Sequence, residues 1–162
     1  MRRVLFLDFD GVLNNTGWFE KQAAYWKGVP GALRAPREER DFDPENMRYL
    51  GMIQYMVPGL EIVVSSSWRK GRTIDQLRGY LAGYVPPRRV VDVTGAHESR
   101  LRHIEITEWL DAQDPPVDRF IALDDDTFDM TPLGGNFLHV HRSTGLTWKH
   151  VQAAVAHLMG AR

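Results

Sequence analysis

The sequence contains no cysteine, which excludes disulfide bonds and thiolate metal sites. It also contains no run of about 18 apolar residues, the length that a membrane-spanning helix requires. Neither sign of charge dominates, because 20 basic and 21 acidic residues give a net charge of −1, so global charge predicts no polyanionic partner. Internal repeats and low-complexity segments are absent as well. We therefore expect one globular domain over residues 1–162.

The amino-terminal residues do not follow the pattern of a secretory signal. Arg2 and Arg3 precede an apolar run, but Asp8 and Asp10 interrupt it, and no small-residue cleavage site follows. We therefore expect a cytoplasmic location and no membrane partner.

Five short apolar runs, rich in β-branched residues, are typical of strands that are buried on both faces of a parallel sheet. They are Val4–Phe9, Glu61–Ser65, Arg89–Val93, Phe120–Leu123 and Phe137–Val140. Helical periodicity lies between them, with predicted amino-terminal caps at Asp43, Thr73, Ser99 and Thr147. Alternating strands and helices predict an α/β fold of three layers, Rossmann-like, around a central parallel sheet of about five strands.

Residues 14–42 do not fit this alternation. The segment holds Trp18, Phe19, Tyr25 and Trp26, followed by a stretch rich in glycine, proline and charge. It is long for a connection inside a compact domain, and such segments are often functional. We expect a flap or minimal cap here, whose aromatic residues either form a small core or stack on a ligand.

Polar side chains follow three of the predicted strands. Asp8 and Asp10 end the first strand, Ser65–Ser67 end the second, and Asp124–Asp126 end the fourth. Ligands of open α/β sheets bind beyond the carboxyl ends of the strands, so these groups are expected at one edge. Serines and aspartates there often serve only as turn or cap residues. Several carboxylates at one edge repel each other unless a cation lies among them, and oxygen ligands favour Mg²⁺.

A site of this composition suits phosphoryl transfer. A carboxylate can attack phosphorus and form an aspartyl-phosphate, and a second acid can protonate the leaving oxygen and then activate water. Residues two apart in an extended strand point to the same side, so Asp8 and Asp10 are expected to reach one substrate.

The stretch FLDFDGVLN resembles the first motif of the haloacid dehalogenase (HAD) superfamily, in which DxDGxL follows an apolar strand. The resemblance implies that Asp8 is the nucleophile. It implies that Asp10 is the general acid and base and contacts the metal through its backbone carbonyl. IVVSSSW resembles the second motif and points to Ser66 as the phosphate contact, with Ser65 as the alternative.

Two further stretches resemble the remaining HAD motifs. RHIEITEWL points to Arg102 as the cationic residue, with Arg100 as the alternative, and IALDDDTFD supplies the acidic pair. That pair is Asp124 with Asp125, or Asp125 with Asp129. The resemblance thus implies Mg²⁺ held by Asp8, Asp10, Asp124 and Asp125. We also expect Ser65, Ser67 and Arg69 to bind the substrate.

The resemblance implies a Mg²⁺-dependent phosphomonoester hydrolase that works through phospho-Asp8. Because the chain has no room for a large cap, it is similar to the HAD domains of RNA-repair and polynucleotide phosphatase type. A nucleotide or nucleic-acid end is therefore one expected substrate. Between Arg69 and Arg89 there are six basic residues and one acidic residue, which fits a surface that faces phosphate groups. A solvated helix face explains the same cluster equally well. The alternatives are a small metabolite, a phosphoprotein, or a non-catalytic phosphate-binding domain. A phosphomutase is a further alternative, whereas a dehalogenase or a receiver domain fits the motifs less well.

Overall fold

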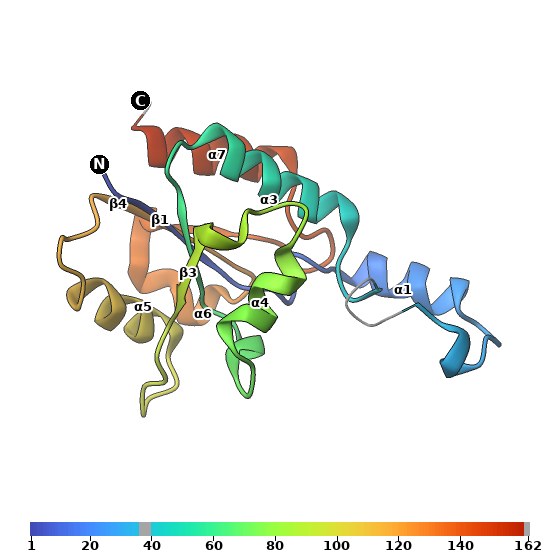
Figure 1. Ribbon diagram of the computed structural model, residues 1–162. Helices are drawn as coiled ribbons and strands as arrows, with labels where there is room; N and C mark the ends of the chain where they lie inside the picture. Colours follow the sequence, from blue (N-terminus) through green and yellow to red (C-terminus); the bar gives the residue numbers. More distant parts are fainter. Residues whose placement is uncertain (36–39, 161–162) are drawn as a thin grey trace.

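The computed structural model describes residues 1–35 and 40–160, which form a five-stranded, entirely parallel sheet flanked by helices (Figure 1). The strands lie in the order β3-β2-β1-β4-β5, so β1 is central. Their bounds are β1 Arg3–Leu7, β2 Glu61–Val64, β3 Val90–Val93, β4 Arg119–Asp124 and β5 Phe137–His139. The five predicted strands are confirmed to within about two residues at each end.

Helices cover both faces of the sheet, which makes three layers as predicted. Six α-helices lie in the described residues: α1 Thr16–Tyr25, α3 Pro44–Met56, α4 Ile74–Leu81, α5 Arg102–Asp111, α6 Thr127–Met130 and α7 Trp148–Met159. Leu5 and Leu7 of β1 pack in a core with residues of α3, α4 and α7, whereas Val4 and Phe6 pack with residues of α5 and α6. The alternation of side chains along one strand therefore supplies both cores.

The described part of the chain also holds four short 3-10 helices: η1 Gly31–Leu33, η2 Ser67–Arg69, η3 Pro87–Arg89 and η4 Thr131–Asn136. The element η2 is the one that bears on the site, because it follows β2 directly and carries the predicted serine motif into a tight turn. Ser66 caps it, accepting a hydrogen bond from the Trp68 backbone N–H at 3.3 Å.

Three of the four predicted helix caps are confirmed. Asp43 caps α3 with Pro44 in the first turn, Thr73 caps α4 in a capping box with Gln76, and Thr147 is the cap of α7. The prediction for Ser99 is wrong. Helix α5 begins at Arg102 after Leu101, while the Ser99 hydroxyl accepts a hydrogen bond from the Leu101 N–H at 3.2 Å in the preceding turn.

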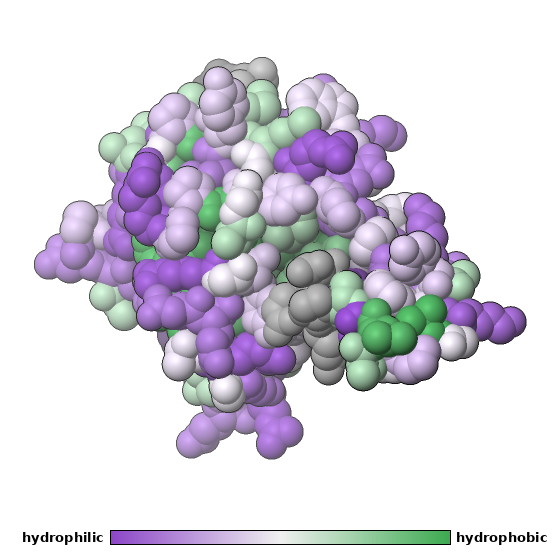
Figure 2. Space-filling model, turned by 45° about the vertical axis from the view of Figure 1, so that its right-hand side comes forward, coloured by the Kyte–Doolittle hydropathy of each residue, from purple (hydrophilic) through white to green (hydrophobic). Residues whose placement is uncertain are grey.

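Helix α1 and η1 form an arm that projects to one side of the sheet (Figure 1). Asn15 anchors the base of the arm, because its amide donates to Asp43 and Asn46, both at 2.8 Å. Every residue of α1 is at least partly exposed, and Tyr25 packs edge-on against Trp26 while remaining 74% exposed. Figure 2 shows a hydrophobic area on this arm. Residues 36–39 of the predicted flap lie outside the described residues.

Within the described residues, none of the helices combines the length and the apolar character needed to cross a membrane.

Candidate active site

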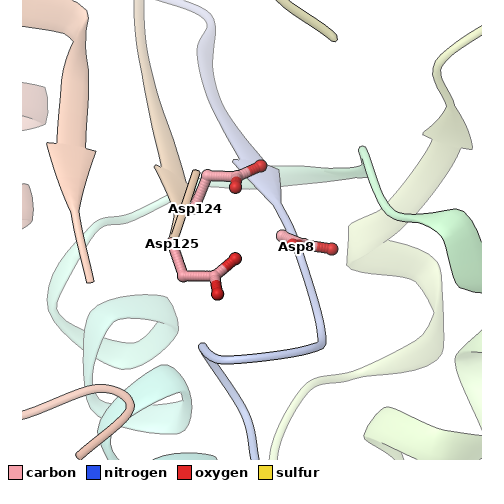
Figure 3. A group of neighbouring side chains, drawn as sticks. All are labelled: Asp8, Asp124 and Asp125. Atoms are coloured by element: carbon pink, nitrogen blue, oxygen red, sulfur yellow. The ribbon is translucent and has the colours of Figure 1, made fainter. Parts of the chain in front are cut away.

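Three carboxyl groups meet at the carboxyl edge of β1 and β4 (Figure 3). Asp8 follows β1, Asp124 is the last residue of β4, and Asp125 comes next. Because β1 and β4 are paired in parallel, with Leu7 opposite Leu123, their ends coincide. One oxygen from each carboxyl group lies within 4.8 Å of the others. This spacing allows the three side chains to share one cation.

Arg102 is the cation that the chain itself supplies to Asp8 and Asp124. Its Nη1 lies 3.0 Å from Asp8 Oδ2 and also donates to Asp124. Its backbone N–H donates to Asp129 Oδ2 at 2.7 Å, which fixes the start of α5 against the site. Of the two arginines that the sequence left open, the structure brings Arg102 to the carboxylates, while Arg100 lines a neighbouring cavity.

The electrostatics of the site are dominated by the burial of Asp8 and Asp124 beside Arg102. Burial raises the pKa of the Asp8 carboxyl, against the charge of Arg102 and hydrogen bonds from Ser66 and the Phe9 N–H. Burial, and then the Asp8 charge, raise the pKa of Asp124 to about 7. Burial alone lowers the pKa of Arg102, but Asp8 and Asp124 together raise it above its ordinary value. Without a further cation the Asp8–Asp124 pair therefore retains a proton near neutral pH.

The serine motif places two hydroxyl groups in different surroundings. Ser66 is fully buried and its hydroxyl is hydrogen-bonded to Asp8. Ser65 is also buried, but among the described residues its Oγ has no hydrogen-bond partner. Of the two, the structure thus brings Ser66 to the nucleophile candidate. Ser67 is exposed and lines the same cavity as Arg100.

Asp10 lies apart from the three carboxyl groups and is exposed. Its Oδ1 accepts a hydrogen bond from Asn14 Nδ2 at 3.0 Å, and its Oδ2 accepts one from Trp68 Nε1 at 2.9 Å. These two donors hold both oxygens in place beside the site. Neither hydrogen bond was predicted from the sequence. Asn14 lies only four residues after Asp10, so their contact could have been considered, whereas no sequence pattern indicates the contact between Asp10 and Trp68.

Gly11 permits the close approach of the two acidic loops. Its φ of +75° lies in the left-handed region that favours glycine, and a Cβ there would meet Asp125 Oδ2 at 2.5 Å. Asp125 Oδ2 itself accepts a hydrogen bond from Arg142 Nε at 2.8 Å and forms an ion pair with Arg142 Nη2 at 2.7 Å. Arg142 was not predicted, and nothing in the local sequence pattern links it to Asp125.

The other aspartates of the acidic run have local tasks. Asp126 caps α6 by accepting hydrogen bonds from the Phe128 and Asp129 N–H groups. Asp129 accepts from the Arg102 N–H and contacts His103 Nδ1 at 3.0 Å. The structure therefore places Asp124 and Asp125, and not Asp129, with Asp8.

Arg69 has three partners inside the protein. It donates to the Ser66 carbonyl at 2.9 Å, to the Gly95 carbonyl at 3.1 Å and to Glu105 Oε2 at 2.6 Å. Both members of the ion pair are nearly buried, with side-chain exposures of 9% and 6%. These bonds tie the serine loop to α5 and give Arg69 a structural task; its predicted contact with substrate stays a prediction.

The parallel sheet, the aspartates at the carboxyl ends of β1 and β4 and the serine after β2 agree with the resemblance to HAD domains. The chain belongs to the family described as the HAD domain in Swiss Army Knife RNA repair proteins, whose sequence model matches residues 4–151. No curated protein matches the chain significantly.

Two solved structures share the fold. One is the HAD domain of the effector protein Lem4 from Legionella pneumophila, with a TM-score of 0.59 and 12% identity, covering 99% of this chain and 98% of that one. The other is an inactive mutant of the same domain, with a TM-score of 0.59 and 13% identity, covering 98% of this chain and 95% of that one. Together with the family match, they confirm the α/β HAD fold and support a HAD-type phosphatase in general terms.

Proposed function

We propose that the chain is a Mg²⁺-dependent phosphomonoester hydrolase in which Asp8 attacks phosphorus. The observation that carries the proposal is the meeting of Asp8, Asp124 and Asp125 within 4.8 Å, with Arg102 bound to two of them. An arrangement that serves only the fold would not be expected to bury two carboxylates around one arginine and beside a third carboxylate, because each buried charge is costly to desolvate.

The residues fit a magnesium ion. The candidate ligands are carboxylate oxygens of Asp8, Asp124 and Asp125, together with the backbone carbonyl of Asp10 that the family resemblance implies. Hard oxygen ligands are those that Mg²⁺ prefers. Burial and the neighbouring Asp8 charge raise the pKa of Asp124 to about 7, and a divalent cation bound there would oppose this rise. Bound there, Mg²⁺ would neutralise phosphate oxygens and so favour attack by an anion.

The chain's own residues would divide the reaction between two carboxyl groups. One oxygen of Asp8 forms the bond to phosphorus while the ester P–O bond breaks, and Asp10 gives a proton to the departing oxygen. Asp10 then takes a proton from water, which attacks phosphorus, releases phosphate and restores the Asp8 carboxylate. Asn14 and Trp68 hold Asp10 during both steps, and Ser66 and Arg102 orient the attacking carboxylate.

The proposed substrate is a nucleotide or a nucleic-acid end. Its support is the family description, which places such HAD domains in RNA repair proteins, and the described surface around Asp10, which is open to solvent. The arm of α1 lies beside this opening, since Phe19 lines a small cavity together with Asp10, Gly11 and Arg142. The proposed role of residues 14–42 as a flap or minimal cap rests on this placement.

The test is the hydrolysis of a generic phosphomonoester by wild type and Asp8→Asn. We expect Asp8→Asn to lose about three orders of magnitude or more in kcat, and EDTA to remove wild-type activity. Asp111→Asn is the matched control, because Asp111 is exposed at the far end of α5, and its activity should be unchanged. Wild-type activity in Asp8→Asn would refute the nucleophile. A screen of oligonucleotide ends, sugar phosphates and phosphopeptides decides the substrate class.

A further inference from the structure

A cavity of about 330 Å³ opens beside the three carboxyl groups, and its charged lining is mainly cationic. Arg102 forms the boundary between the cavity and the site, because it both contacts Asp8 and lines the cavity. The remaining lining comes from the turn after β2 (Ser67, Arg69 and Lys70), from the loop before α5 (Ala96, His97 and Arg100) and from Glu105 of α5 itself.

The charges of this lining separate into paired and unpaired groups. Arg69 is neutralised by Glu105 at 2.6 Å, and His97 Nε2 lies 3.3 Å from Glu108. Lys70 and Arg100 differ, since within residues 1–35 and 40–160 neither side chain makes an ion pair or hydrogen bond. Two free cations therefore face a cavity that begins at the proposed phosphoryl site.

The backbone of Arg100 adds to this picture. Arg100 is the one non-glycine residue of the described chain with a positive φ, at 57°, and its N–H donates to the His97 carbonyl at 3.0 Å. This left-handed turn is unfavourable for a residue with a Cβ. An exposed arginine with no protein partner is thus held in a conformation that glycine or asparagine would adopt more easily.

We infer that Lys70 and Arg100 form a binding site for a second phosphate group of the substrate, next to the phosphate that is hydrolysed. The inference rests on the proposed function and narrows it. A nucleoside bisphosphate or a nucleic-acid end, in which a phosphodiester neighbours the terminal phosphate, carries such a group, whereas a nucleoside monophosphate or sugar monophosphate does not. Cations and phosphate oxygens form charge-assisted hydrogen bonds, which are stronger than neutral ones.

The experiment compares kcat/KM for adenosine 3′,5′-bisphosphate with kcat/KM for adenosine 3′- and 5′-monophosphate. We expect wild type to prefer the bisphosphate by about tenfold or more. Lys70→Ala and Arg100→Ala should each reduce that preference by about tenfold, or abolish it. This is the loss expected when one charge-assisted hydrogen bond is removed. Turnover of the monophosphates should stay within about twofold of wild type, since neither side chain contacts the carboxyl groups.

Arg88→Ala is the matched control. It removes the same charge from an exposed arginine in η3. Because η3 precedes β3, Arg88 lies at the amino-terminal ends of the strands, whereas the cavity lies at their carboxyl-terminal ends. Its preference for the bisphosphate should equal that of wild type. Raising the salt concentration should weaken bisphosphate turnover in wild type and Arg88→Ala more than in the two cavity variants.

The outcomes separate the two proposals. If wild type hydrolyses monophosphates but shows no preference for the bisphosphate, the second phosphate site is refuted and the phosphatase proposal stands. The same conclusion follows if Lys70→Ala and Arg100→Ala retain the full preference, or lose activity equally on both substrates. If wild type hydrolyses none of these phosphomonoesters in Mg²⁺, nor any in the wider screen, the proposed function itself fails.

Discussion

The raised pKa of Asp124 predicts an unusual dependence of stability on pH in the absence of metal. The folded protein holds a proton on the Asp8–Asp124 pair up to a pH of about 7, whereas an unfolded aspartate loses its proton near 3.8. Between these values the folded state binds more protons than the unfolded state. The free energy of unfolding therefore decreases as the pH rises from about 4 to about 7, and levels off above that.

The size of the effect follows from the shift. Moving from 3.8 to about 7 is roughly three pKa units, and each unit corresponds to about 1.4 kcal/mol, so the loss is on the order of 4 kcal/mol at most. Asp124 is only 1% exposed, so solvent screening reduces this figure little. Asp124→Asn cannot titrate and leaves Asp8 alone with Arg102. The difference in unfolding free energy between wild type and Asp124→Asn should thus fall with rising pH.

The assay is urea unfolding in EDTA at several values between pH 5 and pH 8, for wild type, Asp124→Asn and the control Asp111→Asn. Saturating Mg²⁺ should restore wild-type stability at pH 8, because the ion binds the deprotonated pair in the folded state only. Asp111→Asn should follow wild type at every pH. A wild-type minus Asp124→Asn difference that is constant within about 0.5 kcal/mol, or that rises with pH, would refute the account of the site's charges.

Three further predictions concern the surroundings of the site. Gly11→Ala should raise the dissociation constant for Mg²⁺ by about tenfold in calorimetry, because the new Cβ displaces Asp125, which it would meet at 2.5 Å. Trp68→Phe should reduce kcat by about tenfold with little change in melting temperature, since the ring stays among Phe42 and Tyr80 while Asp10 loses a donor. Glu105→Gln should lower the unfolding free energy by about 2 kcal/mol or more in urea, because it leaves the nearly buried Arg69 without its charge partner.

Each of these variants has a matched control in the chain. For Gly11→Ala the control is Gly28→Ala, because Gly28 has nearly the same φ, +76°, and no described atom lies within 4 Å of the added Cβ. Equal Mg²⁺ affinities in the two alanine variants would contradict the proposed clash with Asp125. Trp26→Phe removes an indole donor that binds Gln22 of the same helix region, and an equal kcat in both tryptophan variants would count against the role of Trp68. Glu108→Gln affects a pair whose carboxylate is 57% exposed and should cost less than about 1 kcal/mol, so an equal cost would contradict the burial argument.

The fold could be read from the sequence because its signals are local. Short apolar runs mark the five strands, and Asp43 and Thr73 supply helix caps through bonds to residues two or three positions away. The start of α5 was predicted wrongly because it depends on a contact between residues far apart in the sequence. Asp129, 27 residues further on, accepts from the Arg102 N–H and so helps to set where that helix begins, and Ser99 offers only a local turn.

The candidate site was predictable only in part. The ends of paired strands coincide, so Asp8, Asp124 and Asp125 could be expected together. Asp10 was expected beside Asp8 because residues two apart in a strand share a side, but β1 ends at Leu7 and the chain turns, with the Leu13 N–H donating to the Phe9 carbonyl at 2.8 Å. In this turn Asp10 accepts a hydrogen bond from Trp68, a contact across 58 residues that no local pattern indicates.

Helix α1 was also beyond local reasoning. All its residues are at least partly exposed, so it has no apolar stripe that helical periodicity could reveal, and Asn15 caps it through a bond to the Trp18 N–H. Its packing depends on the anchor between Asn15, Asp43 and Asn46 at the base of the arm.

The central claim is that Asp8 forms a covalent bond to phosphorus. The most direct measurement is rapid quenching of wild type during turnover of a phosphomonoester in Mg²⁺, followed by peptide mass spectrometry. We predict a phosphoryl adduct on the peptide that contains Asp8, absent from Asp8→Asn and present at a higher level in Asp10→Asn, which lacks the group that activates water. Turnover without any adduct on that peptide, or with the adduct on another residue, would contradict the account.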